Sequence, residues 1–220
     1  KKNKKFKLIS SKNYDLTSKS KSKKLKNIKG EFKVIFFSAL TPDKGKGLKT
    51  FYKNSDMMRN FIQNFNIKSI NHFTYISSDA VYSQKDIKVN ESTNPSPDDL
   101  YGMMHLSREY IIKDFLDPLN LTILRPTLIY GNGDTHNSYG PNRFIKQLIN
   151  NQPINIFGKG LDQRDHISVQ DVCNAIFLTS ENKSSGIFNV VTGKSNTFKK
   201  IANLVIKYHN KKASINFIKN

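Results

Sequence analysis

Residues 73–82 have the sequence Phe-Thr-Tyr-Ile-Ser-Ser-Asp-Ala-Val-Tyr, and residues 101–105 have the sequence Tyr-Gly-Met-Met-His. The apolar start of the first segment, residues 73–77, predicts a short buried β-strand. The second segment lies in a predicted helix over residues 98–115, which begins with two aspartates that are able to cap it. A strand followed by a loop and a helix is the repeating unit of parallel α/β folds, so these residues decide the fold class.

The segments on both sides continue this alternation. Upstream, the apolar patterns predict strands at residues 6–9, 14–17 and 33–39 and a helix at 48–66. Downstream, they predict a strand at 121–125, a helix at 143–150, a strand at 154–157, a helix at 170–180, a strand at 187–191 and a helix at 197–208. The pattern changes after Pro126, where residues 130–143 are rich in Gly, Asn, Pro and Asp and predict a functional loop.

The charge is concentrated at the start of the chain. The formal net charge is +19, and the first 33 residues hold 13 lysines against two acidic residues. This concentration of lysines has two explanations: a biased amino-acid composition, or a surface patch that binds an anionic polymer. These lysines have no interleaved aromatic residues and no amphipathic period, so composition is favoured and nucleic acid is not expected as a partner.

The single cysteine and the apolar runs bear on the cellular environment. Cys173 is the only cysteine of the 220 residues, which excludes an intrachain disulfide and fits a reducing compartment, so a cytoplasmic location is expected. No apolar run approaches the roughly 18 residues that a membrane span needs, and no membrane partner is expected.

Tyr101 and His105 are four residues apart on the predicted helix and therefore share a face. A tyrosine phenol is a poor base at neutral pH, but a cation beside it favours the phenolate and makes it useful for proton transfer. Ser78, at the end of the preceding strand, could hold the same substrate oxygen. The alternative is a partly buried tyrosine that packs on the sheet with its hydroxyl bonded locally.

These segments resemble the extended short-chain dehydrogenases/reductases, in the branch of the NAD-dependent epimerases and dehydratases that act on nucleotide sugars. The resemblance implies that Ser78 and Tyr101 are catalytic. The family places a lysine four residues after the tyrosine, where this chain has His105. A neutral imidazole there would give one hydrogen bond to the nicotinamide ribose, and a protonated imidazole would also give charge.

Asp79 follows the predicted catalytic serine. In the 4,6-dehydratases of this family the matching motif is Thr-Asp-Glu, and this chain has Ala80 in place of the glutamate. Asp79 therefore fits a catalytic position, while the missing glutamate argues against dehydratase chemistry. A strand-end cap is the alternative role for Asp79.

The resemblance also implies a Rossmann-like, doubly wound parallel sheet with a small C-terminal substrate lobe. We expect an NAD(P)-binding part over residues 1–125 and a substrate lobe, with interleaved Rossmann elements, over residues 126–220. The family opens with a strand and a Gly-x-x-Gly-x-x-Gly turn, and the glycines, of which Gly30 is the first, do not form that pattern near the start. If the resemblance holds, about 25 residues or more, including the first strand, are expected upstream; the C-terminus also looks early.

The cofactor is expected to be NAD or NADP. The segment 6–9 leads into Ser10-Ser-Lys12 rather than an acidic residue, which leaves NADP open. The resemblance places one residue near the adenine, two small residues at a strand end and two residues beside the nicotinamide: Asp15, Ser38, Ala39, Pro126 and Thr127.

The substrate residues implied by the resemblance lie downstream. Arg164, in the segment 158–165, matches an arginine that grips the nucleotide diphosphate, a task that suits a bidentate guanidinium. Asn142 and Arg143 open a predicted helix and suit a second phosphate contact. The alternative for Arg164 is a salt bridge to one of the nearby aspartates, Asp165 or Asp171. The histidines show no ligand spacing, so no metal site is expected.

These features favour NAD(P)-dependent epimerisation, oxidation or reduction of a nucleotide-activated sugar. The alternative is a non-catalytic NAD(P)-binding sensor or scaffold of the same fold, in which the loss of the lysine has ended catalysis. The sequence does not separate an epimerase from a reductase, and it leaves the sugar and the formation of a homodimer open.

Overall fold

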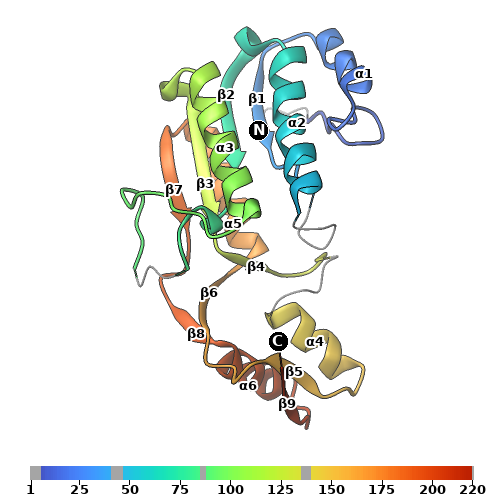
Figure 1. Ribbon diagram of the computed structural model, residues 1–220, viewed down its shortest axis with the longest axis vertical. Helices are drawn as coiled ribbons and strands as arrows, with labels where there is room; N and C mark the ends of the chain where they lie inside the picture. The colour runs from blue at the N-terminus through green and yellow to red at the C-terminus, as the bar shows by residue number, and fades with distance from the viewer. Residues whose placement is uncertain (1–5, 41–46, 85–87, 135–139, 220) are drawn as a thin grey trace. The chain divides into compact units, whose positions relative to one another are not determined.

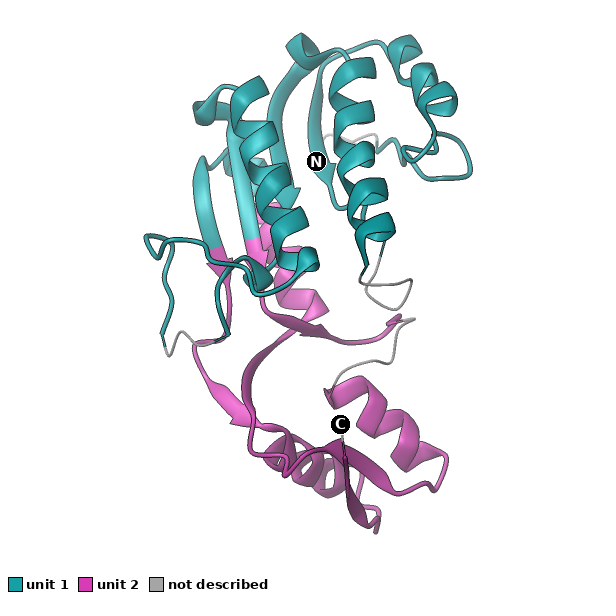
Figure 2. Ribbon diagram, in the orientation of Figure 1, with its two compact units in different colours: residues 1–124, 179–188 teal, residues 125–178, 189–220 magenta. Residues whose placement is uncertain are grey.

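The computed structural model describes residues 6–40, 47–84, 88–134 and 140–219. The chain forms two compact units (Figure 2). The first comprises residues 1–124 and 179–188, and the second comprises residues 125–178 and 189–220. Each unit therefore contains segments that are distant in the sequence.

A four-stranded sheet in the order β1-β2-β3-β7 runs through the first unit. Strand β1 (Phe32–Phe36) pairs in parallel with β2 (Ile70–Ile76), and β2 pairs in parallel with β3 (Leu121–Pro126). Strand β7 (Gly186–Val190) is the neighbour of β3. All six residues of β3 are buried, as expected for a strand inside a parallel sheet that is covered on both faces. The predicted α/β fold with a parallel sheet is confirmed.

Two long helices lie side by side against this sheet (Figure 1). They are α2 (Leu48–Asn64) and α3 (Leu100–Phe115), and they contact each other along the unit. Asp99 caps α3, since its Oδ1 accepts a hydrogen bond from the Gly102 amide at 2.8 Å. The core of this unit combines aliphatic residues with a cluster of aromatic side chains; the Phe36 and Phe61 rings meet edge to face at 5.4 Å.

The two strands predicted nearest the N-terminus were wrong. Residues 6–9 make no strand, and Phe6 and Leu8 are 86% and 73% exposed. An alternating pattern gives a strand only where a neighbour can pair with it. Residues 14–17 turn instead, because the Asp15 carboxylate accepts hydrogen bonds from the Thr17 amide at 3.0 Å and the Thr17 hydroxyl at 2.7 Å. The helices α1 (Lys19–Ser22) and η1 (Lys23–Asn27) follow.

The second unit is built on a small helix pair and short strands. Helix α4 (Gly140–Ile149) packs against α6 (Phe198–Tyr208), and β5 (Ile154–Phe157) pairs in parallel with β9 (Ile215–Ile218). A three-stranded sheet has the order β4 (Leu128–Tyr130), β6 (Gln163–Ser168) and β8 (Ser195–Thr197). The apolar core of this unit centres on Phe144, Leu148 and Ile154.

The remaining elements are short connections and one helix shared by both units. Turns η3 (Ile67–Ser69), η4 (Asp79–Val81) and η5 (Pro118–Asn120) precede or follow the strands of the first sheet. Residues of α5 (Val169–Asn182) belong to both units. Among the described residues, no helix has the length and apolar content for crossing a membrane.

Candidate active site

Ser78 lies just beyond the C-terminal end of β2 and caps the short helix η4. Its Oγ accepts a hydrogen bond from the Ala80 amide at 3.1 Å and donates one to Asp79 Oδ1 at 3.3 Å. The Ser78 side chain thereby caps η4, since it satisfies the amide of the second residue of that helix. Ser78 is half-buried, so its hydroxyl is held in a fixed place without being sealed from solvent.

Helix α3 approaches η4 so closely that only glycine fits at position 102. A Cβ atom on Gly102 would collide with the Ala80 carbonyl group and would lie 2.9 Å from Pro97 Cβ. Gly102 adjoins Tyr101, and Ala80 lies two residues after Ser78. This contact therefore brings the backbone that carries Tyr101 against the turn that Ser78 caps, as the sequence predicted for a shared site.

Tyr101 and His105 share one face of α3, and their rings meet edge to face at 4.8 Å between centroids. The His105 side chain is 3% exposed. Burial, with a smaller contribution from the Arg108 charge, lowers the pKa of His105 to about 3. The imidazole is therefore neutral near pH 7, which removes the option that His105 itself supplies the positive charge.

The hydrogen bonds around His105 indicate which nitrogen carries the proton. The Tyr75 hydroxyl lies 2.8 Å from His105 Nδ1. Burial raises the pKa of Tyr75, and Arg108 acts on the phenol both by its charge and as a hydrogen-bond donor. The phenol keeps its proton and directs it to Nδ1, so the tautomer with the proton on Nε2 is favoured. Nε2 is buried and has no hydrogen-bond partner among the described residues.

A buried polar network lies behind this pair, and the sequence analysis did not predict it. Arg108 donates from Nε and Nη2 to the Asn54 carbonyl, at 2.9 Å from Nε, and from Nη1 to the Ser38 carbonyl at 2.8 Å. Ser77 Oγ donates to Glu109 Oε1 at 2.6 Å. The sequence carried a signal for this network, because Arg108 and Glu109 are adjacent charged residues on a helix that packs on a sheet. Charged residues seldom lie in a core without a structural or functional role.

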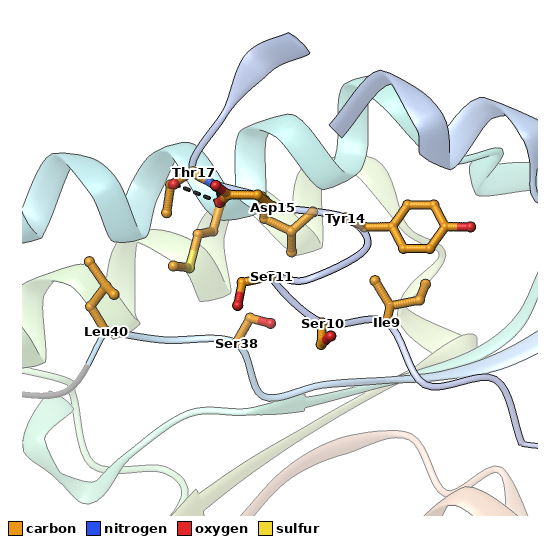
Figure 3. Close-up of a pocket in the computed structure, with 10 residues that line it drawn as sticks. Ile9, Ser10, Ser11, Tyr14, Asp15, Thr17, Ser38 and Leu40 are labelled. Atoms are coloured by element: carbon orange, nitrogen blue, oxygen red, sulfur yellow. Dashed lines mark hydrogen bonds between the residues drawn. The ribbon is translucent and has the colours of Figure 1, made fainter. Parts of the chain in front are cut away.

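A cavity of about 270 Å³ lies in the first unit, between the N-terminal segment and the end of β1 (Figure 3). Its polar wall includes Ser10, Ser11, Asp15 and Ser38. Ala39, next to Ser38 in the sequence, does not line it. The bonds from Thr17 contribute most to lowering the pKa of Asp15, so its carboxylate is charged near pH 7.

In the second unit, Thr127 has a structural role. Pro126 ends β3, and Thr127 bonds through its amide to the Val190 carbonyl at 3.3 Å and through its hydroxyl to the Asp165 carbonyl at 3.0 Å. Both residues are buried. The hydrogen bonds of Thr127 hold the start of this unit together. The position of the backbone is the only support for placing Pro126 and Thr127 beside the nicotinamide.

Asn142 and Arg143, which were predicted to contact phosphate, have partners within the second unit. Asn142 Nδ2 donates to the Gly131 carbonyl at 3.0 Å and to Asp134 Oδ2 at 2.8 Å. The Arg143 guanidinium lies 4.9 Å from the Phe157 ring centroid and donates to the Asn155 carbonyl at 3.0 Å. These contacts fix a loop and a strand and account for Asn142, whereas Arg143 Nε is buried without a hydrogen-bond partner among the described residues.

Arg164 lies half-buried on β6, and its two candidate salt-bridge partners have other hydrogen bonds. Asp165 accepts from the Thr192 hydroxyl at 2.6 Å and from the Gly193 amide at 2.7 Å. Asp171 accepts from the Ser168 hydroxyl at 2.7 Å. The environment of Arg164 on β6 therefore differs from those of Asn142 and Arg143, the two other residues predicted to contact phosphate.

Two histidines outside this site, His72 and His166, have structural partners. His72 Nε2 lies 2.9 Å from Thr122 Oγ1, and His166 Nδ1 lies 3.1 Å from the Arg164 carbonyl. Within residues 6–40, 47–84, 88–134 and 140–219, three or more histidine, cysteine or acidic side chains do not gather as metal ligands.

The fold and these residues together define a protein class. The model of the NAD dependent epimerase/dehydratase family matches residues 3–191. The chain therefore belongs to the NAD-dependent epimerase/dehydratase family, as the resemblance had implied.

Relatives that are named for different activities match this chain. An uncharacterized UDP-glucose epimerase of Bacillus subtilis is 28% identical over 153 residues, which cover 68% of this chain and 48% of that protein. A dTDP-4-dehydro-6-deoxyglucose reductase of Escherichia coli is 29% identical over 176 residues, which cover 77% of this chain and 54% of that protein. The chain thus spans about half the length of these curated relatives.

Solved structures confirm the Rossmann-like fold. The crystal structure of a UDP-glucuronic acid 4-epimerase from Bacillus cereus, in complex with NAD, has a TM-score of 0.71 and 26% identity; the match covers 82% of this chain and 60% of that one.

Proposed function

We propose that this chain is part of an enzyme that uses NAD or NADP to epimerise, or to oxidise or reduce, a nucleotide-activated sugar. The observation that carries the proposal is the contact between Gly102 and Ala80, which sets the Tyr101 helix against the turn capped by Ser78. A serine hydroxyl and a phenol held on neighbouring elements suit one substrate hydroxyl.

Each residue of the first unit has a proposed task. Ser78 binds the reacting hydroxyl and orients it, and Tyr101 takes its proton. His105, neutral and with its proton on Nε2, donates a hydrogen bond to the ribose of the cofactor. The nicotinamide, when bound, takes up the hydride from the sugar carbon. Asp79 supports Ser78 through their hydrogen bond, which is a positioning task.

The described residues fit a dinucleotide in two places. The cavity beside Asp15 and Ser38 combines apolar walls with hydroxyl and carboxylate oxygens, which suits an adenosine moiety. The buried Nε2 of His105 has no partner among the described residues and would gain one from a ribose hydroxyl. The predicted places of Ala39, Pro126 and Thr127 beside the cofactor remain proposals.

The second unit is proposed to hold the nucleotide. Arg164 is the favoured contact to the diphosphate, because it matches the arginine of the family's Gly-x-Gly…Arg-Asp segment and a guanidinium binds two phosphate oxygens at once. Asn142 and Arg143 are weaker candidates, since their side chains already bond to Gly131 and Asn155. Relatives include an epimerase and a reductase, so both reactions stay in the proposal.

The experiment is to purify the protein from its complete reading frame, denature it and identify any released nicotinamide cofactor by mass spectrometry. Titration calorimetry with NAD and NADP follows if none is retained. Bound NAD or NADP supports the proposal, and no retention together with no binding of either contradicts it.

A second step separates the enzyme from a binding module of the same fold. The cofactor-loaded protein is mixed with a panel of nucleotide sugars, and the products are separated by chromatography. The enzyme proposal expects a new sugar nucleotide from the native protein and none from Tyr101→Phe. Cofactor binding without turnover of any sugar would favour the non-catalytic alternative.

A further inference from the structure

The neutral His105 leaves the proposed site without the charge that the family takes from lysine. A phenol that accepts a proton near neutral pH needs a positive charge close by, because its ordinary pKa lies near 10. Burial holds the imidazole neutral. The charge must therefore come from another residue of this chain.

Arg108 is placed to provide it. Tyr101 and Arg108 are seven residues apart on α3, which is close to two helical turns, and His105 lies between them on the same face. The Arg108 side chain is 0% exposed. Its guanidinium is fixed by hydrogen bonds to the Asn54 and Ser38 carbonyls, so the charge does not move.

We propose that the Arg108 guanidinium is the fixed positive charge of this site, and that it stabilises the Tyr101 phenolate in place of the lysine that the family has at position 105. Its role in catalysis rests on the proposed function. Arg108 acts through Tyr101 and is a positioning residue, because its own donors are bound to the Asn54 and Ser38 carbonyls and to the Tyr75 hydroxyl.

Electrostatics support this assignment. The interaction with Tyr101 favours the protonated guanidinium, and an interaction between two charges acts equally on both partners. Burial lowers the pKa of Arg108, but a guanidinium starts above pH 12 and here donates to two carbonyls, so it remains charged near pH 7. Few water molecules screen a charge at this depth.

The other titratable groups around Arg108 do not supply a competing cation. From β2, Tyr75 is kept protonated by burial. From α3 itself, His105 is neutral and Glu109 is an acid bonded to Ser77. From α2 the contact is the Asn54 carbonyl, and after β1 it is the Ser38 carbonyl. Among these groups the guanidinium is the one whose charge favours a phenolate, through its interaction with Tyr101.

The experiment measures the pKa of Tyr101 directly in the full-length protein labelled with ¹³Cζ-tyrosine. NMR spectra are recorded across a pH series, and Tyr101→Phe identifies the resonance. In the native protein the pKa of Tyr101 is expected below the ordinary value of about 10. Arg108→Gln is expected to raise it by roughly 1 pH unit or more, and Arg108→Lys, which keeps the charge, is expected to stay closer to the native value.

The outcomes separate this inference from the proposed function. A native value at or above about 10 overturns the inference, even if the glutamine variant does not fold. An equal value in folded native and Arg108→Gln proteins also overturns it. The cofactor content of the same samples, measured by mass spectrometry, tests the function separately. A pKa rise on Arg108→Gln in a protein that neither retains nor binds NAD or NADP would support the Arg108 charge while contradicting the enzyme proposal.

Discussion

Tyr75 on β2 and His105 on α3 join the sheet to the helix through a buried hydrogen bond of 2.8 Å between the phenol oxygen and Nδ1. Both side chains are nearly inaccessible to water. A buried polar pair of this kind fixes the register of the helix on the sheet, because sliding α3 by a turn would leave both groups without a partner. The position of Tyr101, four residues before His105, is set by the same bond.

The low pKa of His105 predicts acid sensitivity. The pKa is about 3 in the folded chain and ordinarily about 6.5, so between these values the unfolded chain binds the additional proton. The free energy of unfolding therefore falls as the pH falls through this range, by up to about 1.4 kcal/mol per pH unit from this residue. Above the ordinary value His105 contributes no pH dependence.

The measurement compares urea unfolding of the native protein and His105→Leu at several pH values between about 5 and 7.5. The variant should lose stability less steeply on acidification, whatever its stability at neutral pH. His72 and His166 also have lowered pKa values and affect both proteins alike, so only the difference in slope is informative. Parallel curves would show that folding does not lower the pKa of His105.

Gly102→Ala is expected to destabilise the protein although alanine favours helices. The added Cβ would collide with the Ala80 carbonyl and crowd Pro97, and overpacking of this kind costs about 1–3 kcal/mol. Ser107→Ala on the same helix is the control, because it removes one hydroxyl that bonds to the Met103 carbonyl. The control should stay within about 0.5 kcal/mol of the native protein in chemical denaturation. Equal stability of the two variants would mean that α3 can move away from η4.

Substitutions of Arg164 and Asp165, which are adjacent on β6, should separate an effect on nucleotide binding from an effect on stability. Asp165 accepts three hydrogen bonds from the turn at 192–194, so Asp165→Ala should lower the stability of the protein by about 1–3 kcal/mol. Arg164→Ala should weaken binding of uridine diphosphate or thymidine diphosphate by about tenfold or more, because it removes a guanidinium that can bind two phosphate oxygens. Calorimetry and denaturation measure the two effects. Native affinity in Arg164→Ala would remove this residue from the nucleotide site.

The cavity next to Asp15 predicts a role for its carboxylate in cofactor binding. Asp15→Ala should weaken NAD or NADP binding by about tenfold, which corresponds to about 1.4 kcal/mol. Thr17→Val is the matched control, because it removes the 2.7 Å hydrogen bond and keeps the carboxylate. If both variants lose affinity equally, the geometry of the turn matters rather than the charge of Asp15.

Much of the fold could be predicted because the apolar patterns are strong. The helices at 48–66 and 98–115 and the strand at 121–125 were confirmed with small shifts of their ends. The strands β6 and β8 were missed, since Gln-Arg-Asp-His-Ile-Ser and Ser-Asn-Thr have little apolar content. Such strands form because neighbouring segments of the fold offer backbone hydrogen-bond partners. The apolar pattern of one segment does not show which other segments will lie beside it.

The candidate site was predicted in part. Ser78, Tyr101 and His105 follow from position, because a strand end and the first turn of the next helix meet at one edge of a parallel sheet. The charge state of His105 did not follow, since it depends on the depth of burial where α3 packs on the sheet, next to Tyr75 of β2. The predicted roles of Asn142 and Arg143 overlooked local partners such as Asp134 and Phe157 that only the fold brings together.

The division of the chain has a consequence for its synthesis. Residues 179–188 complete the first unit, and β7 is the neighbour of β3 in its sheet. As the chain leaves the ribosome, β3 keeps an open edge until β7 has also emerged. By then residues 125–178, more than half of the second unit, have been translated. A nascent chain that stalls before β7 would therefore expose an unpaired apolar strand, the kind of edge that chaperones cover and that aggregates recruit.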